Sequence, residues 1–369
     1  MNVDQMPQWL PSLFVPFLTL SYPAEKPVDP DSFPNSSYYK TGPLDACFIV
    51  TCIAVMAVVR DSVRLGVFEP FARWKLTRGR RMEPEQMVLK SEKEGLDGNG
   101  VHEKGNGVEH VVNGQGIAEF SSRSFQSKEE RRIHRSVLRF AEQGYSVLYY
   151  GFSWCFGMYV HMNLPTQVLN PTHVWLNYPH IPIPGPVKAY YLIQTAFYIH
   201  QVLVLNAEAR RKDHWQMMTH HVITITLVFL SYFYNFTRVG CMIMLIMDWC
   251  DIFLPLAKMF GYLKMQTLCD VTFVFFLLSW FTTRHVLFIN AIRSTYYDIV
   301  VYIKFDWAPE RGHRFVYSTY VIFVSLLVAL QALQIMWSWT ITRIAWRVVT
   351  GANAEDDRSD DEEVDRKRR

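Results

Sequence analysis

Stretches of about 20 mainly apolar residues alternate with polar blocks along this chain, and a helix of that length spans the roughly 30 Å hydrocarbon core of a bilayer. We therefore predict an all-α polytopic membrane protein with about seven transmembrane helices. Their expected positions are 44–60, 143–162, 188–206, 216–234, 238–259, 268–290 and 315–341. A shorter apolar stretch, 8–20, contains two prolines, and we expect it to lie at the membrane interface or to re-enter the membrane.

The composition agrees with this alternation. Of the 369 residues, 50% are hydrophobic, and the polar residues gather at 21–43, 61–142 and 351–369. This distribution argues against a soluble globular enzyme and against a disordered protein. The six cysteines lie in or beside apolar runs without a CxxC pair, so we interpret them as reduced packing residues. Basic side chains flank the apolar runs and form no domain of their own, which argues against a nucleic-acid partner.

Lysine and arginine are distributed unevenly around the first predicted span. Residues 60–81 contain seven basic side chains and two acidic ones. Because positively charged loops stay in the cytosol, we predict a lumenal N-terminal segment, 1–43, and a cytosolic C-terminus after seven crossings. Asn35, in Asn35-Ser36-Ser37, is then an expected lumenal glycosylation site. The loop 163–187 has six prolines and no acidic residue, lysine or arginine, and we expect it on the lumenal side as well.

The predicted cytosolic linker, 61–134, separates the first two spans. Within this region, 82–135 is rich in Gly, Asn, Glu and His and shows no apolar period. Such a segment buries too little apolar surface to offset the entropy that it would lose on folding. We therefore predict that the linker is partly disordered.

Two neighbouring predicted spans carry titratable side chains at depths where such groups are costly, which makes each a candidate functional residue. His220 and His221 lie inside the fourth apolar run. Asp248 and Asp251 lie in the middle of the fifth, three positions apart on one helix face. A short turn near 235–238 joins the two helices, so at 1.5 Å per residue His220 and Asp251 both lie about 20 Å from it. The pattern predicts a carboxylate that orients a proton-transferring imidazole.

Three further residues have more than one interpretation. Arg284 in the sixth span either joins the site or extends toward the lumenal interface. His200 in the third span is either a core residue or part of the site. His214 lies at the membrane surface beside basic residues, where a positioning role is the more natural one.

Two other functions use buried polar groups of this kind. A di-iron lipid hydroxylase requires several histidine boxes, but H-x5-HH (His214, His220, His221) occurs once and HxxHH does not occur. A membrane transporter also buries carboxylates, and transporters often contain an internal repeat, which this sequence does not show. A membrane lipid transporter or sensor stays the alternative, and the hydroxylase is less favoured.

One long run carries most of the distinctive residues: DHWQMMTHHVITITLVFLSYFYNFTRVGCMIMLIMDWCDIFLPLAK, from 213 to 258. It combines a His pair, SYxxNxxRxG, an Asp-x-x-Asp pair and a closing Ala-Lys. This run resembles the signature of TLC-domain ceramide synthases of the longevity-assurance type, also called sphingosine N-acyltransferases. Further matching stretches are RFAEQGYSVLYY (139–150), WLNYPH (175–180), YIHQVLVLN (198–206) and TRHVLF (283–288). Met247 stands where animal members often have His, so the chain resembles the fungal form.

The resemblance implies transfer of a fatty acyl group from acyl-CoA to the amine of a sphingoid base, such as dihydrosphingosine, in the endoplasmic reticulum membrane. It implies that 135–345 is the catalytic domain, with spans two to seven forming a six-helix barrel around an acyl tunnel. The implied catalytic residues are His220, His221, Asp248 and Asp251. We expect five substrate-binding residues: His200, His214, Asn235, Arg238 and Arg284. Neither metal nor cofactor is expected, because acyl-CoA is a substrate and the transfer needs no redox step.

The remaining expectations concern the ends of the substrate and of the chain. Arg210, Arg211 and Lys212 precede the fourth span, and we expect them to bind CoA phosphates, which a helix N-terminus also favours. The resemblance to fungal members favours C16–C18 acyl chains. In the cytosolic tail, 346–369, Ser359 precedes Asp360, Asp361 and Glu362, and we expect it to be a phosphorylation site. Besides acyl-CoA, the sphingoid base and the bilayer, we expect a second copy of the chain or a small single-span subunit as a partner.

Overall fold

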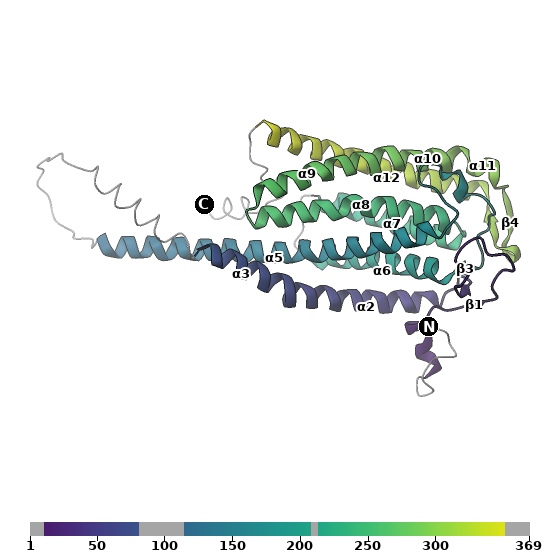
Figure 1. The fold of residues 1–369 in the computed structure, drawn as a ribbon, viewed down its shortest axis with the longest axis horizontal. Helices are drawn as coiled ribbons and strands as arrows, with labels where there is room; N and C mark the ends of the chain where they lie inside the picture. The colour runs from purple at the N-terminus through teal and green to yellow at the C-terminus, as the bar shows by residue number, and fades with distance from the viewer. Residues whose placement is uncertain (1–10, 81–113, 208–212, 351–369) are drawn as a thin grey trace, which may run out of the picture. The chain divides into compact units, whose positions relative to one another are not determined.

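The computed structural model describes residues 11–80, 114–207 and 213–350, and these are mainly helical (Figure 1). Four helical stretches of this described part are long and apolar enough to cross a membrane: Asp45–Thr77, Thr237–Tyr262, Gln266–Tyr302 and Tyr317–Arg347. The predicted class, a helical multi-pass membrane protein, is therefore confirmed. The chain divides into two compact units. The first comprises Met1–Val59, Tyr149–Phe253 and Val274–Arg369, and the second comprises Arg60–Leu148 and Leu254–Phe273.

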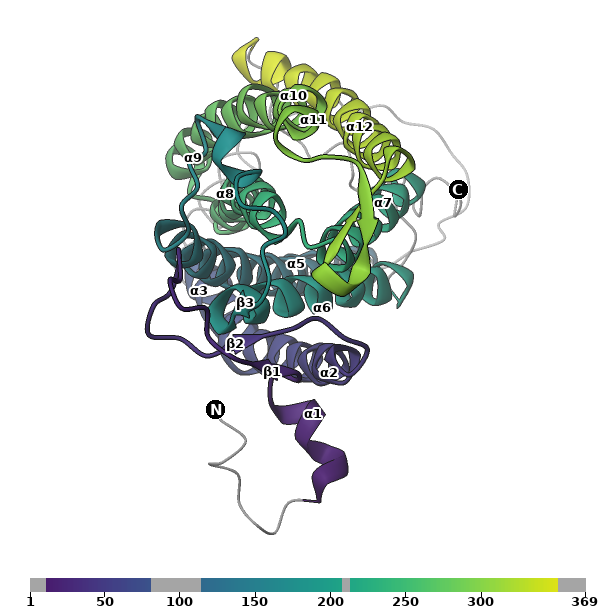
Figure 2. The ribbon, with the colours of Figure 1, turned by 90° about the vertical axis from the view of Figure 1, so that its right-hand side faces the viewer.

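Each of the predicted spans is helical in the structure. The helices are α2 (Asp45–Val63), α5 (Gly114–Met162), α6 (Gly185–Ala207), α7 (His214–Phe233), α8 (Thr237–Tyr262), α9 (Gln266–Trp280) with its continuations η5 (Phe281–Leu287) and α10 (Phe288–Tyr297), and α12 (Tyr317–Val349). The apolar stretch near the N-terminus contains only the short η2 (Ser12–Phe14) and α1 (Val15–Leu18). Within the first unit, α7 lies beside both α6 and α12, and α12 also packs on α10 (Figure 2).

Small strands join segments of the first unit that are far apart in sequence. The strands β1 (Pro23–Ala24), β2 (Tyr38–Tyr39) and β3 (Ile183–Pro184) form an antiparallel sheet in the order β1-β2-β3. A second antiparallel pair, β4 (Asp306–Ala308) and β5 (His313–Phe315), is closed by η6 (Pro309–Arg311) and by Gly312, whose φ of 74° suits a residue without a Cβ. The first sheet ties the N-terminal segment to the loop before α6, two segments that the charge pattern assigns to one side of the membrane.

An aromatic core fills this same end of the first unit. Trp175, just after η4 (Pro171–Val174), and Phe236, in the turn between α7 and α8, are both buried, with ring centroids 5.9 Å apart. The indole nitrogen of Trp175 donates a 2.8 Å hydrogen bond to Ser294 of α10, and Phe315 of β5 packs against Phe236. The short α11 (Ile299–Tyr302) follows in the same region. Burial of these rings joins loops that would otherwise be independent.

A buried ion pair holds the N-terminal segment against α6. The Nζ atom of Lys188 lies 2.7 Å from a carboxylate oxygen of Asp45, and both side chains are almost fully buried. Lys188 also donates hydrogen bonds to the carbonyl oxygens of Ser21 and Lys40, each at 2.7 Å. Asp45 in turn accepts a hydrogen bond from the hydroxyl of Tyr232 on α7. The charges are therefore compensated on both sides, as burial requires.

The second unit changes the prediction for the linker. The predicted linker reaches residue 134, but α5 begins at Gly114, and η3 (Arg64–Phe68) and α3 (Glu69–Arg80) follow α2. Val137 and Phe140 of α5 are buried against Ala72 of α3, which gives this helix an apolar contact that its polar sequence does not reveal. Residues 81–113, where the low-complexity part of the predicted linker lies, are outside the described residues.

Candidate functional site

Asp248 lies on the buried face of α8, and two neutral donors face its carboxyl group. Its side chain is 2% exposed. The Oδ2 atom accepts a 2.6 Å hydrogen bond from the hydroxyl of Ser153 on α5 and another, also 2.6 Å, from the amide of Gln194 on α6. Two donors converge on one carboxylate oxygen, an arrangement that stabilises the charged form of the group.

Asp251, one turn further along α8, is instead paired with a cation. The Nη2 atom of Arg284 lies 2.8 Å from its Oδ2 atom. The same guanidinium donates hydrogen bonds to the carbonyl oxygen of Met247 at 2.9 Å and to Cys250 Sγ at 3.2 Å, and it lies over the ring of Trp280. Arg284 is 5% exposed and belongs to the π-helical η5. The structure therefore places Arg284 with the candidate site and not at the membrane interface.

The histidine pair lies in the second turn of α7. The ring centroid of His220 is 5.4 Å from that of His221 and 5.2 Å from that of Trp337 on α12. His220 is close enough to Arg284 for their charges to interact. The Nδ1 atoms of both histidines are buried and have no hydrogen-bond partner among the described residues. The Nδ1 atom of each ring is therefore not occupied by a hydrogen bond from the described residues.

The predicted direct contact between a carboxylate and an imidazole is not formed. In the described part of the chain, the hydrogen bonds of Asp248 and Asp251 go to Ser153, Gln194, Cys250 and Arg284, and none goes to the histidine pair. The reason is rotational: residues three apart on a helix share a face only approximately, and here Asp248 meets α5 and α6 while Asp251 meets η5. Arg284 likewise forms no hydrogen bond to either histidine in this part of the chain, so the acid-arginine cluster acts on the pair only electrostatically, through the charge of Arg284 on His220.

The predicted substrate-binding residues separate into two places. His200 is buried on α6, and His214 is buried at the start of α7 beside Trp215. Asn235 and Arg238 lie beyond the other end of α7, about 30 Å further along its axis at 1.5 Å per residue. There Asn235 donates a 2.8 Å hydrogen bond to the carbonyl oxygen of Gly312. These two residues therefore do not join the histidine pair.

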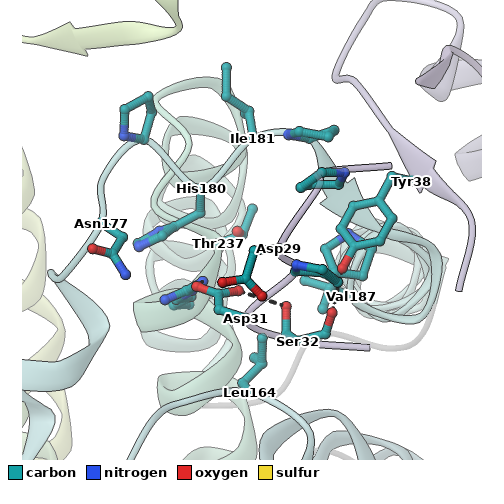
Figure 3. Close-up of a pocket in the computed structure, with 16 residues that line it drawn as sticks. Asp29, Asp31, Ser32, Tyr38, Leu164, Asn177, His180, Ile181, Val187 and Thr237 are labelled. Atoms are coloured by element: carbon teal, nitrogen blue, oxygen red, sulfur yellow. Dashed lines mark hydrogen bonds and ion pairs between the residues drawn. The ribbon is translucent and has the colours of Figure 1, made fainter. Parts of the chain in front are cut away.

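Arg238 lines a separate cavity at the end where the aromatic core lies (Figure 3). The cavity has a volume of about 370 Å³ and is formed by the N-terminal segment, the loop before α6 and the start of α8. Asp31 and Arg238 form an ion pair there. Burial alone would raise the pKa of Asp31, but the hydrogen bond and charge of Arg238 outweigh it and hold that pKa below its ordinary value.

The histidine that lines this cavity is a poor candidate for proton transfer. Burial, aided by the nearby positive charge of Arg238, lowers the pKa of His180 to about 3, so its imidazole stays neutral at physiological pH. Its Nε2 atom lies 2.8 Å from the carbonyl oxygen of Leu176 and is engaged in a structural hydrogen bond. With Asp31 committed to Arg238, neither titratable group is poised for acid-base chemistry.

Several predicted site residues lie outside the described residues. These are the CoA-phosphate candidates Arg210, Arg211 and Lys212, and the tail residue Ser359. Asn35 lies within the residues that the structure describes, and its side chain is exposed, as a glycan acceptor must be. Within residues 11–80, 114–207 and 213–350, no group of three or more His, Cys, Asp or Glu side chains could hold a metal ion.

The partners of Asp248 are functional candidates that the sequence analysis misses. Ser153 and Gln194 are buried polar residues in apolar runs, and Tyr149 donates a 3.0 Å hydrogen bond to Gln194. The only signal in the sequence is the cost of burying an amide without a partner, which marks Gln194 but does not identify what it binds.

Comparisons with known proteins match the part of the chain that contains these residues. The model of the TLC domain matches residues 139–343, which include the histidine pair, both aspartates, Gln194 and Arg284. A sphingosine N-acyltransferase of Schizosaccharomyces pombe is 34% identical over 351 residues, which is 95% of this chain and 73% of that protein. A ceramide synthase of Gibberella moniliformis is 36% identical over 252 residues, 61% of this chain and 59% of that protein. A ceramide synthase of Caenorhabditis elegans is 35% identical over 221 residues, 58% of each chain.

Proposed function

This chain belongs to the TLC-domain family, and from that premise we propose that it is a ceramide synthase, an acyltransferase that joins a fatty acyl group from acyl-CoA to the amine of a sphingoid base. The observation that carries the proposal is that the matched domain contains both a histidine pair with buried, unbonded Nδ1 atoms and a buried acid-arginine cluster. Fungal and animal relatives named as ceramide synthases or sphingosine N-acyltransferases support it.

The reaction requires a base and a group that stabilises negative charge. The sphingoid amine is largely protonated at neutral pH and must lose a proton before its nitrogen attacks the thioester carbon. The C–N bond then forms, the C–S bond breaks, and the CoA thiolate accepts a proton. In our proposal, one member of the His220 and His221 pair removes the amine proton, and the other stabilises the oxygen of the tetrahedral intermediate.

A second route uses the same residues. One histidine attacks the thioester and forms an acyl-imidazole, which the amine then cleaves. In both routes the net negative charge of Asp248, Asp251 and Arg284 stabilises the positive charge that develops on an imidazole or an amine. The chemistry needs neither a metal nor a redox cofactor, since acyl-CoA is consumed as a substrate.

The proposed membrane arrangement follows the positive-inside rule. We infer seven spans, with spans two to seven around the acyl chain, in the endoplasmic reticulum membrane. The histidine pair then lies near the cytosolic face, where acyl-CoA arrives, and Arg210, Arg211 and Lys212 would neutralise its phosphates. A second copy of the chain or a small single-span subunit stays a predicted partner.

An acylation assay tests the proposed function. Purified protein in detergent and lipid, given a panel of acyl-CoAs and sphingoid bases, should form N-acyl products detectable by mass spectrometry, with C16–C18 acyl-CoAs preferred. Absence of any new amide with every pair, from protein that is folded by its thermal transition, would contradict the proposal. A transporter or sensor would give that outcome, because it binds lipid without forming a bond.

The orientation predicts an opposite fate for the two sides of the first span. In sealed microsomes, added protease should cut the 82–113 region and spare the segment around Asn35. Asn35→Gln should remove a mass shift that endoglycosidase also removes, whereas Ser32→Ala, which leaves the acceptor sequence intact, should not. Protection of 82–113 from protease would reverse the proposed orientation.

A further inference from the structure

A buried amide connects three helices of the first unit at Asp248. Gln194 on α6 is 0% exposed. Its Nε2 atom donates to Asp248 Oδ2 at 2.6 Å and to the hydroxyl of Ser153 at 2.7 Å. The hydroxyl of Ser153 donates a hydrogen bond to the same carboxylate oxygen. Both side chains donate to the same carboxylate oxygen of Asp248, which is the final acceptor of these hydrogen bonds.

Tyr149 determines which way this amide points. Its hydroxyl donates a 3.0 Å hydrogen bond to Gln194 Oε1, which leaves the nitrogen of the amide facing the carboxylate. The tyrosine ring is itself fixed, since it stacks on Phe197 with 3.5 Å between centroids and 10° between planes. The opposite amide orientation would set Oε1 against Asp248 and lose both donors. The order of donation is therefore Tyr149 to Gln194 to Asp248.

The other charged and titratable groups near Asp248 do not replace these donors. The groups that interact with it electrostatically are Asp251 on its own helix and, from the neighbouring helices, Tyr149, Tyr150, Tyr190, Tyr198 and Arg284. Among these, Arg284 is the one cation, and its hydrogen bonds go to Asp251, Met247 and Cys250. Within the described part of the chain, the hydrogen bonds to the Asp248 carboxyl group come only from the neutral side chains of Ser153 and Gln194.

We propose that Gln194 is a positioning residue for acyl transfer: oriented by Tyr149, it keeps Asp248 as a charged carboxylate beside the Asp251–Arg284 pair. The cluster then carries one net negative charge, which stabilises the cation that forms when a histidine takes the amine proton. This inference rests on the proposed function, which supplies the reaction that Gln194 serves. Gln194 touches no reacting atom and acts through Asp248.

Two substitutions at Gln194 distinguish the loss of its hydrogen-bond donors from the introduction of a negative charge beside Asp248. Gln194→Leu keeps the size of the side chain but removes both donors, and it should lower kcat about 10- to 100-fold at every pH, with the KM for acyl-CoA little changed. In Gln194→Glu, an ionised glutamate would oppose the Asp248 carboxylate at hydrogen-bond distance, whereas a protonated one can still donate one hydrogen bond. Its activity should therefore fall steeply as pH rises from 6 to 8.5, relative to the wild type.

The control is the same change at another buried glutamine of the first unit. Gln331 on α12 is 8% exposed and contacts the ring of His285, not Asp248. Gln331→Glu should not reproduce the pH-dependent loss. Tyr149→Phe, which keeps the stacked ring and removes the orienting hydroxyl, should lower kcat less than Gln194→Leu and leave the thermal transition close to that of the wild type.

The outcomes distinguish this inference from the proposed function. Wild-type acylation together with an unchanged kcat and pH profile in both Gln194 variants would overturn the role of Gln194 alone. A loss of activity in Gln194→Glu that does not vary with pH, or an equal pH dependence in Gln331→Glu, would also overturn it. If Gln194→Leu does not fold, an unchanged kcat in Tyr149→Phe decides against the inference. Wild-type protein that forms no amide would overturn the proposed function and this role with it.

Discussion

Replacing either His220 or His221 by alanine should reduce acyl transfer by about 10²- to 10⁴-fold, the range that a positioned acid-base group contributes to a reaction. Both rings lie in one turn of α7, and their buried Nδ1 atoms form no hydrogen bond with the described residues. Steady-state rates with purified variants and a C16 or C18 acyl-CoA measure the loss. The double variant should be no worse than the poorer single variant, because residues that act as a unit give non-additive losses.

The matched control is His173→Ala. His173 lies in η4 within the loop 163–187, apart from the histidine pair. This variant should keep the wild-type rate. Turnover at the wild-type rate in both His220→Ala and His221→Ala would remove the basis for assigning the chemistry to the pair. If one variant accumulates an acylated form of the protein that then reacts slowly, the acyl-imidazole route is favoured over direct transfer.

Removing the buried positive charge of Lys188 should destabilise the protein by about 3–5 kcal/mol, the cost of leaving a buried charge uncompensated. Lys188→Met removes the partner of Asp45 and both hydrogen bonds to the carbonyl oxygens of Ser21 and Lys40. Thermal unfolding of the detergent-solubilised protein measures the change. The expected result is a clearly lower transition temperature and faster proteolysis of the N-terminal segment.

The double variant Lys188→Met with Asp45→Leu distinguishes the buried charge from simple packing. Replacing both members by apolar residues of similar size should recover much of the loss, because no unpaired charge then remains. Lys40→Met, at an exposed neighbouring position, is the control for removal of a lysine and should have little effect. A double variant that is less stable than Lys188→Met would show that the hydrogen bonds of Asp45, such as the one from Tyr232, contribute more to stability than the charge pair does.

Some of the candidate site can be read from the chain alone. The apolar runs have lengths that only membrane-spanning helices need, and the structure forms helices at each of them. His220, His221, Asp248 and Asp251 stand out because a charged or imidazole side chain in such a run is costly and requires a reason. These inferences depend on composition and local spacing, which a linear sequence contains in full.

Local spacing was insufficient where contacts between distant segments decide the outcome. The helix that starts at Gly114 continues to Met162, and its residues Val137 and Phe140 pack on Ala72, a residue of another helix, which the order of residues along the chain does not show. Equal depth predicted that an aspartate would bond to a histidine, but depth does not specify the rotation of each helix about its axis. Rotation is set by packing, and it directs Asp248 toward α5 and α6.

The sequence by itself therefore determined the membrane class, the helices, the histidine and aspartate candidates and the resemblance to one family, because these depend on hydrophobic runs and on residues close together in the chain. The tertiary structure alone decided that Arg284 pairs with Asp251 and that Asn235 and Arg238 lie apart from the histidines. It also decided that Gln194 and Ser153 donate hydrogen bonds to Asp248. Each of those contacts joins residues from separate helices, and which buried donor meets which acceptor depends on how the helices rotate and pack.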